Sequence, residues 1–320
     1  MRRPGLWRPR ILFSKLVTII AYAGSMHMDD VRKKIALEKL IAWSISVFAF
    51  FLASPIFADK LTVVYPRPES STDIRMDYPI ELLKLALSKA GEPYELRPSQ
   101  EYMQQNRALQ QLTDDVELGV VWSMTSRERE KDLLPIRIPI DKGLLGWRIF
   151  FVKRNNLKLL EQVQNLDQLR SLSAGQEHDW PDVEILAANG LKVVQSSNYE
   201  SLFKMLERDR FDYFPRSIDE IWYEEKAHPG MDIAVEQTIA LQYPAAEYFF
   251  VNRKNNALAD ALERGLRLAI KDGSFDRLFT KYNGEAIRLA NIKNRKLFKL
   301  ENPLLPAATP LDQKELWFSQ

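Results

Sequence analysis

The chain has 320 residues, of which 46% are hydrophobic and 28% charged, as in an ordinary globular protein long enough for two domains. It has no cysteine, which excludes disulfides, a thiol nucleophile and thiolate metal sites. The formal charge of +2 is misleading, because residues 1–58 hold nine of the 45 basic residues but only three of the 43 acidic ones. The remainder is mildly acidic, which argues against nucleic acid as a partner.

Residues 1–58 have the pattern of a secretory signal peptide with an upstream extension. Basic residues at 32–34 precede an apolar run at 40–52 and a small residue, Ala58. We expect cleavage after Ala58 and a periplasmic mature protein. An uncleaved membrane anchor over the apolar run is the alternative. We also expect translation to start at Met28, which would make the upstream stretch spurious.

The mature chain opens with alternating strands and helices in residues 59–145. Ligands of open α/β sheets bind beyond the carboxyl ends of the strands, so the strand ends are of interest here. The expected elements are strands at 60–65, 94–97 and 116–122 and helices at 78–90 and 106–112.

Two stretches far apart in the sequence nearly repeat each other. Residues 146–156 contain Ile-Phe-Phe-Val and residues 245–256 contain Tyr-Phe-Phe-Val, each followed by a polar turn. Short aromatic and β-branched runs indicate buried strands. We expect both strands to cross between two lobes, so that residues 157–244 form a second lobe and residues 257–301 return to the first. The cleft between the lobes would then be the functional site.

The second lobe and the closing part continue the same alternation. The expected elements of residues 157–244 are strands at 171–174, 192–195, 211–214 and 233–241 and helices at 179–190, 199–207 and 218–226. Helices are expected at 257–272 and 275–282, and the apolar tail at 302–320 is expected to pack on the first lobe. Small residues at 143–146 and 243–246 favour hinge bending beside the two crossings.

Three short motifs carry a family resemblance. Residues 126–129 look like a Thr-x-Glu-Arg motif, residues 210–213 resemble Arg-x-Asp-Ala, and residues 256–282 resemble a pair of closing helices. In these motifs and in its order of elements the chain resembles the type II periplasmic solute-binding proteins, family 3, of amino-acid ABC transporters. The resemblance implies an α/β fold of two lobes with two hinge crossings. It also implies a monomer without a cofactor that binds a small molecule and serves an ABC permease of the inner membrane.

Two arginines are the main candidates for ligand contacts. Arg129 follows a predicted strand, where a guanidinium can bind a carboxylate through two parallel hydrogen bonds, and Arg127 is the alternative. Arg216 follows a strand of the second lobe. In the family, an aspartate at the position of Ser217 receives the ligand's ammonium group. Its absence beside Arg216 argues against an ordinary α-amino acid, so we expect a small ligand that is anionic or amino-acid-like. A surface ion pair is an equally good interpretation of Arg216, whereas the resemblance favours Arg129 as a ligand contact over a solvated helix start.

The other candidates lie at strand ends or at the start of a second-lobe helix. Flat rings there can stack on a ligand, although core packing is the simpler interpretation of each ring. Residues 175–178 stand where the family has the Gly-Thr-Thr that begins a helix of the second lobe. The candidates are Tyr65, Trp122, Ser123, Gln176, His178 and Trp180.

Other functions are weaker alternatives. The chain has three histidines and no helical histidine spacing, so we expect no metal site. An enzyme of the same fold, a dehydratase or a peptidoglycan-acting enzyme, is one alternative, with Glu177 or Glu247 as general acid or base. A stand-alone periplasmic sensor component is another.

Overall fold

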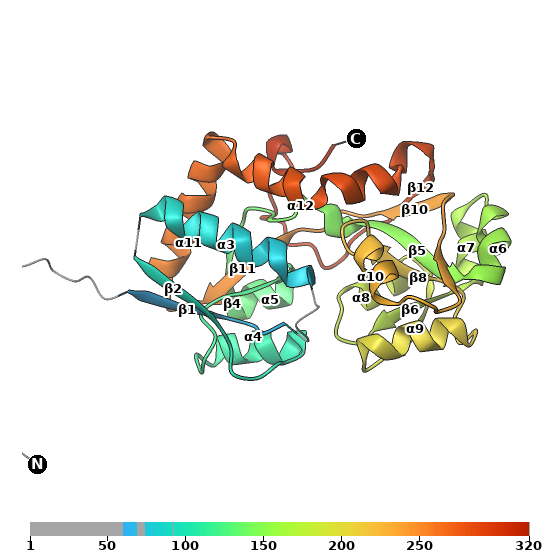
Figure 1. The fold of residues 1–320 in the computed structure, drawn as a ribbon, viewed down its shortest axis with the longest axis horizontal. Helices are drawn as coiled ribbons and strands as arrows, with labels where there is room; N and C mark the ends of the chain where they lie inside the picture. The colour runs from blue at the N-terminus through green and yellow to red at the C-terminus, as the bar shows by residue number, and fades with distance from the viewer. Residues whose placement is uncertain (1–59, 69–73, 92, 320) are drawn as a thin grey trace, which may run out of the picture. The chain divides into compact units, whose positions relative to one another are not determined.

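The computed structural model describes residues 60–68, 74–91 and 93–319 (Figure 1). The predicted signal peptide, its cleavage site and the start site lie outside these residues. Within the described part of the chain, no helix is both long and apolar enough to cross a membrane.

The first lobe holds two small sheets covered by helices (Figure 1). Its parallel pair is β1 (Leu61–Tyr65) with β2 (Tyr94–Pro98). Its antiparallel sheet has β11 (Glu247–Asn252) between β3 (Val121–Met124) and β4 (Leu133–Ile136). The lobe's helices are α3 (Asp77–Ala90), α4 (Gln105–Thr113), α5 (Arg127–Asp132) and α11 (Asn256–Lys271).

Helices α3 and α11 pack with their backbones in close approach. A Cβ atom at Gly265 of α11 would lie 1.9 Å from the carbonyl oxygen of Ala86 in α3. Only glycine fits where two helix backbones approach each other this closely. The amphipathic pattern that predicted both helices therefore also places their apolar faces against each other.

The second lobe is built around β5 (Trp147–Lys153). This strand pairs antiparallel with β8 (Phe214–Ser217), β9 (Ile233–Val235) and β10 (Ile239–Gln242). A separate parallel pair joins β6 (Ser173–Glu177) to β7 (Lys192–Ser196). The helices of this lobe are α6 (Leu157–Glu161), α7 (Leu166–Ser171), α8 (Asp182–Ala188), α9 (Tyr199–Glu207) and α10 (Ile221–Ala227).

The two repeated stretches differ from the expectation in one respect. They form β5 and β11, which lie inside the sheets of different lobes, so the strands themselves do not cross. The crossings are the segments just before them, 137–146 and 243–246. Both strands have fully buried aromatic cores because each lies in the interior of its own lobe's sheet. The two crossings touch, since a Cβ atom at Gly146 would lie 2.1 Å from the carbonyl oxygen of Tyr243.

The part of the chain that follows α11 has a longer helix than expected, and it contacts the second lobe as well as the first. Helix α12 spans Ser274–Ala290, well beyond the predicted end at 282. It is followed by β12 (Lys296–Lys299), which pairs in parallel with β10 of the second lobe. Residues 257–301 therefore do not all belong to the first lobe. The indole of Trp222 in α10 also donates to the Ala286 carbonyl of α12, at 3.1 Å, which ties α12 to the second lobe.

The tail from residue 302 lies over the first lobe and the crossings. The amide of Arg127 in α5 donates to the Leu304 carbonyl at 3.0 Å, and the Phe318 amide donates to the Lys142 carbonyl at 2.7 Å. The indole of Trp317 fills the space beside Gly143, where a Cβ atom would lie 2.5 Å from the ring. The tail thus contacts both the first lobe and the segment that leads into β5.

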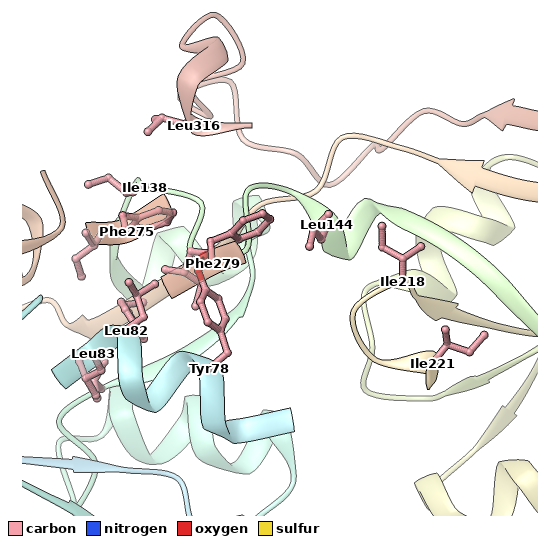
Figure 2. Close-up of a cluster of buried hydrophobic side chains, with 14 of the residues drawn as sticks. Tyr78, Leu82, Leu83, Ile138, Leu144, Ile218, Ile221, Phe275, Phe279 and Leu316 are labelled. Carbon is pink, nitrogen blue, oxygen red and sulfur yellow. Dashed lines mark hydrogen bonds between the residues drawn. The ribbon is translucent and has the colours of Figure 1, made fainter. Parts of the chain in front are cut away.

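The hydrophobic core reaches the crossing segment (Figure 2). Phe279 of α12 contacts Tyr78 of α3, with ring centroids 6.3 Å apart. Figure 2 shows Leu144 of the crossing on one side of these rings and Ile218 of the second lobe beyond it. The hydroxyl of Tyr78 donates to the Ile140 carbonyl at 2.5 Å, so α3 is fixed to the start of the crossing.

Candidate functional site

A cavity of about 400 Å³ lies between the two lobes. The first lobe contributes the start of α3 and the end of β3, and the second lobe contributes the segment 177–182 and the start of α10. The first crossing also reaches the cavity, through Asp141 and Leu145, and Glu247 lines it at the start of β11. A single space therefore touches both lobes and the first of the two segments that join them.

Arg216 lines the cavity but is already neutralised by its own lobe. Its guanidinium, 2% exposed, binds both carboxylate oxygens of Glu224 with bonds of 2.6 to 2.9 Å and lies 3.0 Å from Glu220. Burial favours the neutral form, but these two carboxylates outweigh it and raise the pKa of Arg216. The face of Trp180 lies over the guanidinium at 4.5 Å. Little of this cation is left for a ligand anion.

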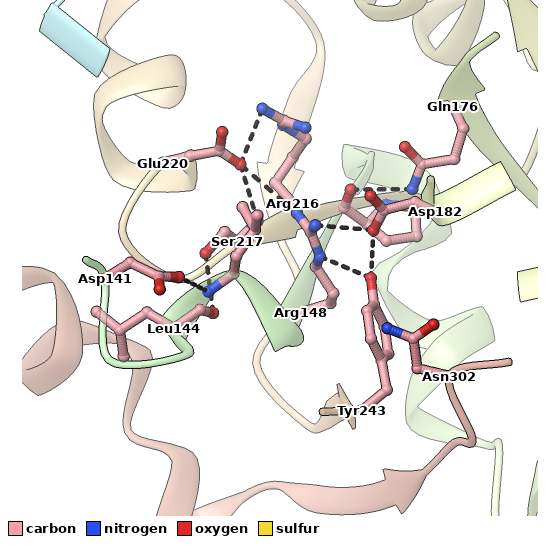
Figure 3. Close-up of polar contacts among 12 residues, drawn as sticks. Asp141, Leu144, Arg148, Gln176, Asp182, Arg216, Ser217, Glu220, Tyr243 and Asn302 are labelled. Atoms are coloured by element: carbon pink, nitrogen blue, oxygen red, sulfur yellow. Dashed lines mark hydrogen bonds and ion pairs between the residues drawn. The ribbon is translucent and has the colours of Figure 1, made fainter. Parts of the chain in front are cut away.

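Arg148 forms a second internal ion pair in the same wall (Figure 3). Its guanidinium lies 2.8 Å from Asp182 and 3.6 Å from Glu220, and it donates to the hydroxyl of Tyr243 at 2.9 Å. That hydroxyl in turn donates to Asp182. The carboxylates overcome the cost of burial and raise the pKa of Arg148. Glu220 thus lies within ion-pair distance of both arginines, and its pKa is lowered because their attraction exceeds the effect of burial.

Asp141, Asp219 and Glu247 also line the cavity, and they form no ion pair with the residues that the structure describes. Asp141 comes from the first crossing, Glu247 is the first residue of β11, and Asp219 lies between β8 and α10. Burial raises the pKa of Asp141 to about 6, and burial together with the charge of Glu220 raises that of Asp219 to about 7. Burial and then the charges of Asp141 and Asp219 raise the pKa of Glu247 well above its ordinary value. These side chains therefore repel one another as they ionise.

The cavity is also crossed by contacts between the lobes. The guanidinium of Arg75, at the start of α3, lies 4.4 Å from the ring centroid of Tyr199 in the second lobe. The side-chain amide of Gln104 donates to the Ser197 carbonyl at 3.0 Å. These contacts join the two lobes on one side of the cavity.

The sequence candidates fall into two groups by position. Trp122, Trp180 and Arg216 line the cavity. Tyr65 lies behind Trp122, with ring centroids 6.3 Å apart. The role of each in ligand binding stays a prediction.

Arg129 points into its own lobe rather than lining the cavity. It donates to the hydroxyl of Ser123 at 2.6 Å, to the Met124 carbonyl at 2.7 Å and to the side chain of Gln105 at 2.8 Å. Burial lowers the pKa of Arg129 to about 10. Arg127 is exposed and faces the tail, where it donates to the Leu305 carbonyl at 3.4 Å.

The remaining candidates also lie outside the cavity lining. Gln176 is buried, and its amide lies 3.5 Å from the Pro215 carbonyl. The hydroxyl of Ser217 donates to Leu144 and Asp219, while the ring of His178 is 44% exposed and lies 3.0 Å from Asp179. The described residues contain no group of three side chains that could hold a metal ion.

Several cavity residues were not among the sequence candidates. Arg148 is a charged residue at the start of an apolar strand run, which was a usable signal for a buried ion pair. Asp141 lies in a Pro-Ile-Asp-Lys-Gly turn and binds the amides of Gly143 and Leu145 at 2.9 and 2.7 Å. Its convergence with Asp219 has no signal in the sequence, because it depends on how the crossings meet.

Solved structures with a similar architecture include binding proteins and a sensor domain. An ancestral arginine-binding protein bound to arginine is 19% identical, with a TM-score of 0.52 over 70% of this chain and 97% of that chain. A histidine kinase sensor domain is 16% identical, with a TM-score of 0.52 over 71% and 96%. The probable amino-acid ABC transporter extracellular-binding protein YtmK of Bacillus subtilis is 17% identical, with a TM-score of 0.53 over 71% and 98%.

No family model matches the sequence, and no curated protein is significantly similar to it. The likeness to solved structures, at under 20% identity, therefore concerns the fold. It covers nearly the full length of each of these structures. The chain has the two-lobed α/β fold of the type II periplasmic binding proteins, as its sequence motifs predict.

Proposed function

We propose that the chain is a solute-binding protein that captures a small organic molecule between its lobes. The observation that supports this proposal most directly is the cavity, which touches both lobes and the first crossing and has the size of an ordinary small-molecule site. The similar structures named above are binding proteins and a sensor domain rather than enzymes, which supports binding without turnover.

Ligand capture would proceed by closure of the lobes. In the first crossing, Gly143 has a φ of 75°, a conformation that only glycine adopts easily. The second crossing, residues 243–246, is a short segment between β10 and β11. A ligand that contacts both lobes would favour the closed arrangement by its differential affinity for it. Contacts such as that of Gln104 with Ser197 then form part of the closed state.

The ligand class that we propose is amino-acid-like. The anionic ligand expected from the sequence depends on Arg129 and Arg216. Arg216 is already paired with two carboxylates, and Arg129 donates to its own lobe. These contacts reduce the support for an anion held by this pair, so the amino-acid-like class has the stronger basis.

The proposed setting is the periplasm, with an ABC permease as partner of a monomeric binding protein. The similarity to an amino-acid transporter's binding protein supports this proposal. The similarity to a histidine kinase sensor domain favours a second candidate, a sensor component that reports the ligand to another protein. Co-purification with a permease would favour the first candidate, and co-purification with a kinase the second.

The experiment is a thermal-shift screen of amino acids and small organic acids, followed by X-ray scattering with the best compound. A bound ligand at a hundred times its Kd adds about 2.7 kcal/mol of stability, which a melting curve detects easily. We expect stabilisation together with a smaller radius of gyration. A protein that gains no stability from any compound in a broad metabolite screen would contradict the proposal.

A further inference from the structure

Three carboxylates converge on the part of the cavity where the crossings meet. Asp141 lies in the segment before β5, Glu247 is the first residue of β11, and Asp219 lies just before α10. Asp141 is 2% exposed, and the other two are partly buried. They come from three separate parts of the chain but line a single space. We call them the acidic cluster.

The acidic cluster has no basic partner among the residues that the structure describes. The neighbouring Glu220 lies within ion-pair distance of Arg148 and Arg216, and the positive charge of Arg75 also acts on it. The other ionisable groups that face the cluster are Glu220 itself, Tyr78 of α3 and, more distantly, Arg148. Of these groups only Arg148 is a cation, and it is already paired with Asp182. The cavity therefore holds an excess of acid at this place.

A second feature of the same cavity also lacks a partner. The side chain of Asn283 in α12 lines the cavity and is 4% exposed. Within the described chain, its Nδ2 atom has no hydrogen-bond partner. Buried amide donors are nearly always satisfied, so an unpaired one in a residue that lines a cavity indicates a missing acceptor. A ligand with an acceptor atom would satisfy Asn283.

The geometry fits an organic cation better than a metal ion. Metal ligands must converge on one point, and the described residues contain no group of three acidic or histidine side chains placed in that way. A protonated amine or a guanidinium has several N–H donors that point in different directions, so it can bind carboxylates that surround it. The aromatic side chains of Tyr78 and Tyr282, whose ring centroids are 5.7 Å apart, also line this part of the cavity.

We propose that the cavity takes a ligand with a protonated amine or guanidinium group, which binds Asp141, Asp219 and Glu247, and with an acceptor atom for Asn283. The inference rests on the proposed function, and it specifies the ligand's charge. The ligand supplies the positive charge that the acidic cluster lacks. A zwitterion or a cationic amino-acid derivative meets both requirements.

Binding of such a cation should displace protons from the acidic cluster. The pKa values of Asp141 and Asp219 are raised to about 6 and about 7, so part of the cluster is protonated near neutral pH. A cation stabilises the ionised carboxylates and lowers these pKa values. Affinity for the cation should therefore fall as the pH falls from 7 to 5.

The test compares four probes of related shape: L-arginine, agmatine, L-glutamine and L-glutamate. Agmatine keeps the guanidinium of arginine but lacks its carboxylate. The proteins are wild type, Glu247→Gln, Asp219→Asn and the control Glu263→Gln, which removes one exposed charge in α11. Calorimetry at pH 7.5 gives each Kd. We expect arginine or agmatine to bind more tightly than glutamate, and each cluster variant to weaken the cation roughly ten- to a hundredfold while the control does not.

The outcomes separate this inference from the proposed function. Glutamate or glutamine binding as tightly as arginine and agmatine, with unchanged affinity in both cluster variants, would overturn the cation site and leave solute binding intact. Failure of all four probes, when a neutral or anionic metabolite binds, would do the same. Absence of binding by any compound of the broad screen would remove the proposed function and this inference with it. Melting curves of the unliganded variants verify that they are folded.

Discussion

Two charged regions of the same cavity differ in whether their charges are paired within the protein. In the second-lobe wall, Arg148 and Arg216 meet Asp182, Glu220 and Glu224 in short, buried ion pairs. At the crossings, the acidic cluster of Asp141, Asp219 and Glu247 has no cation beside it in the described chain. The first region is complete without a ligand, and the second is not.

The difference indicates which charges support the fold and which await a ligand. In a buried ion pair each charge offsets part of the solvation energy that its partner loses, so the arginines of this wall need no ligand to balance them. Like charges at the crossings instead cost energy in the empty protein. A positive ligand would remove that cost where the two lobes move relative to each other, so its binding favours closure.

The largest expected effect follows from breaking the paired region. Glu224→Gln leaves Arg216 with only Glu220 as a carboxylate partner in an environment where the arginine is 2% exposed. Breaking a buried pair costs about 3–5 kcal/mol. We expect a loss of unfolding free energy of this size in a denaturant titration. The neighbouring and exposed Glu225→Gln is the control, and equal stability of the two variants would contradict the account.

An effect of opposite sign is expected at the acidic cluster. Glu247→Gln removes a carboxylate that Asp141 and Asp219 repel, so the unliganded variant should melt a few degrees above wild type at pH 8. Scanning calorimetry without ligand measures the change. A lower melting temperature would show that the Glu247 charge is satisfied in the empty protein. That result would remove the contrast between the two regions.

The pH dependence of stability should reflect the same repulsion. The pKa values of Asp141 and Asp219 are raised to about 6 and about 7 in the folded protein, above their ordinary value of 3.8. Between pH 4 and pH 7 the folded state therefore binds more protons than the unfolded state, and stability from these groups falls as the pH rises. We expect the denaturant midpoint to fall over this range more steeply in wild type than in Asp219→Asn. Identical slopes would contradict the assignment.

The smallest effect is expected at an exposed arginine. Arg127 is a sequence candidate that faces the tail and donates only to the Leu305 carbonyl at 3.4 Å through its side chain. Arg127→Ala should change the unfolding free energy by no more than about 0.5 kcal/mol. A denaturant titration of Arg127→Ala beside Glu224→Gln measures the smallest and the largest expected losses of unfolding free energy. A loss of several kcal/mol would mean that the tail contact matters far more than its geometry indicates.

The local elements were largely predictable, whereas the connections between them were less so. Residues 199–207 form a helix over the predicted range, because Leu202, Phe203 and Leu206 supply a clear helical period. The strand β12 was not predicted, since its four residues carry no distinctive pattern and their partner β10 is distant in sequence. The repeated strands were recognised, but which lobe each belongs to is settled by pairing that a single sequence does not reveal.

Residues of the cavity could be predicted only where the position of a single residue in the sequence indicated a place at the site. Trp122, Trp180 and Arg216 stand at strand ends or a helix start, and the cavity includes them. Glu247 was noted only as a carboxylate for an enzyme. Its proximity to Asp141 and Asp219 depends on the meeting of the two crossings, which lie about a hundred residues apart in the sequence. Likewise, the partners of Arg216 became clear only from the position of α10.

The most direct test of the account is the number of protons released when a cationic probe binds. Calorimetry of L-arginine at pH 7, in two buffers with different ionisation enthalpies, measures this number. We expect net proton release from the wild-type protein and a smaller release from Asp219→Asn, because the pKa of Asp219 is raised to about 7 and this variant lacks its displaceable proton. Binding without proton release, or with proton uptake, would contradict the claim that a ligand cation completes the acidic cluster.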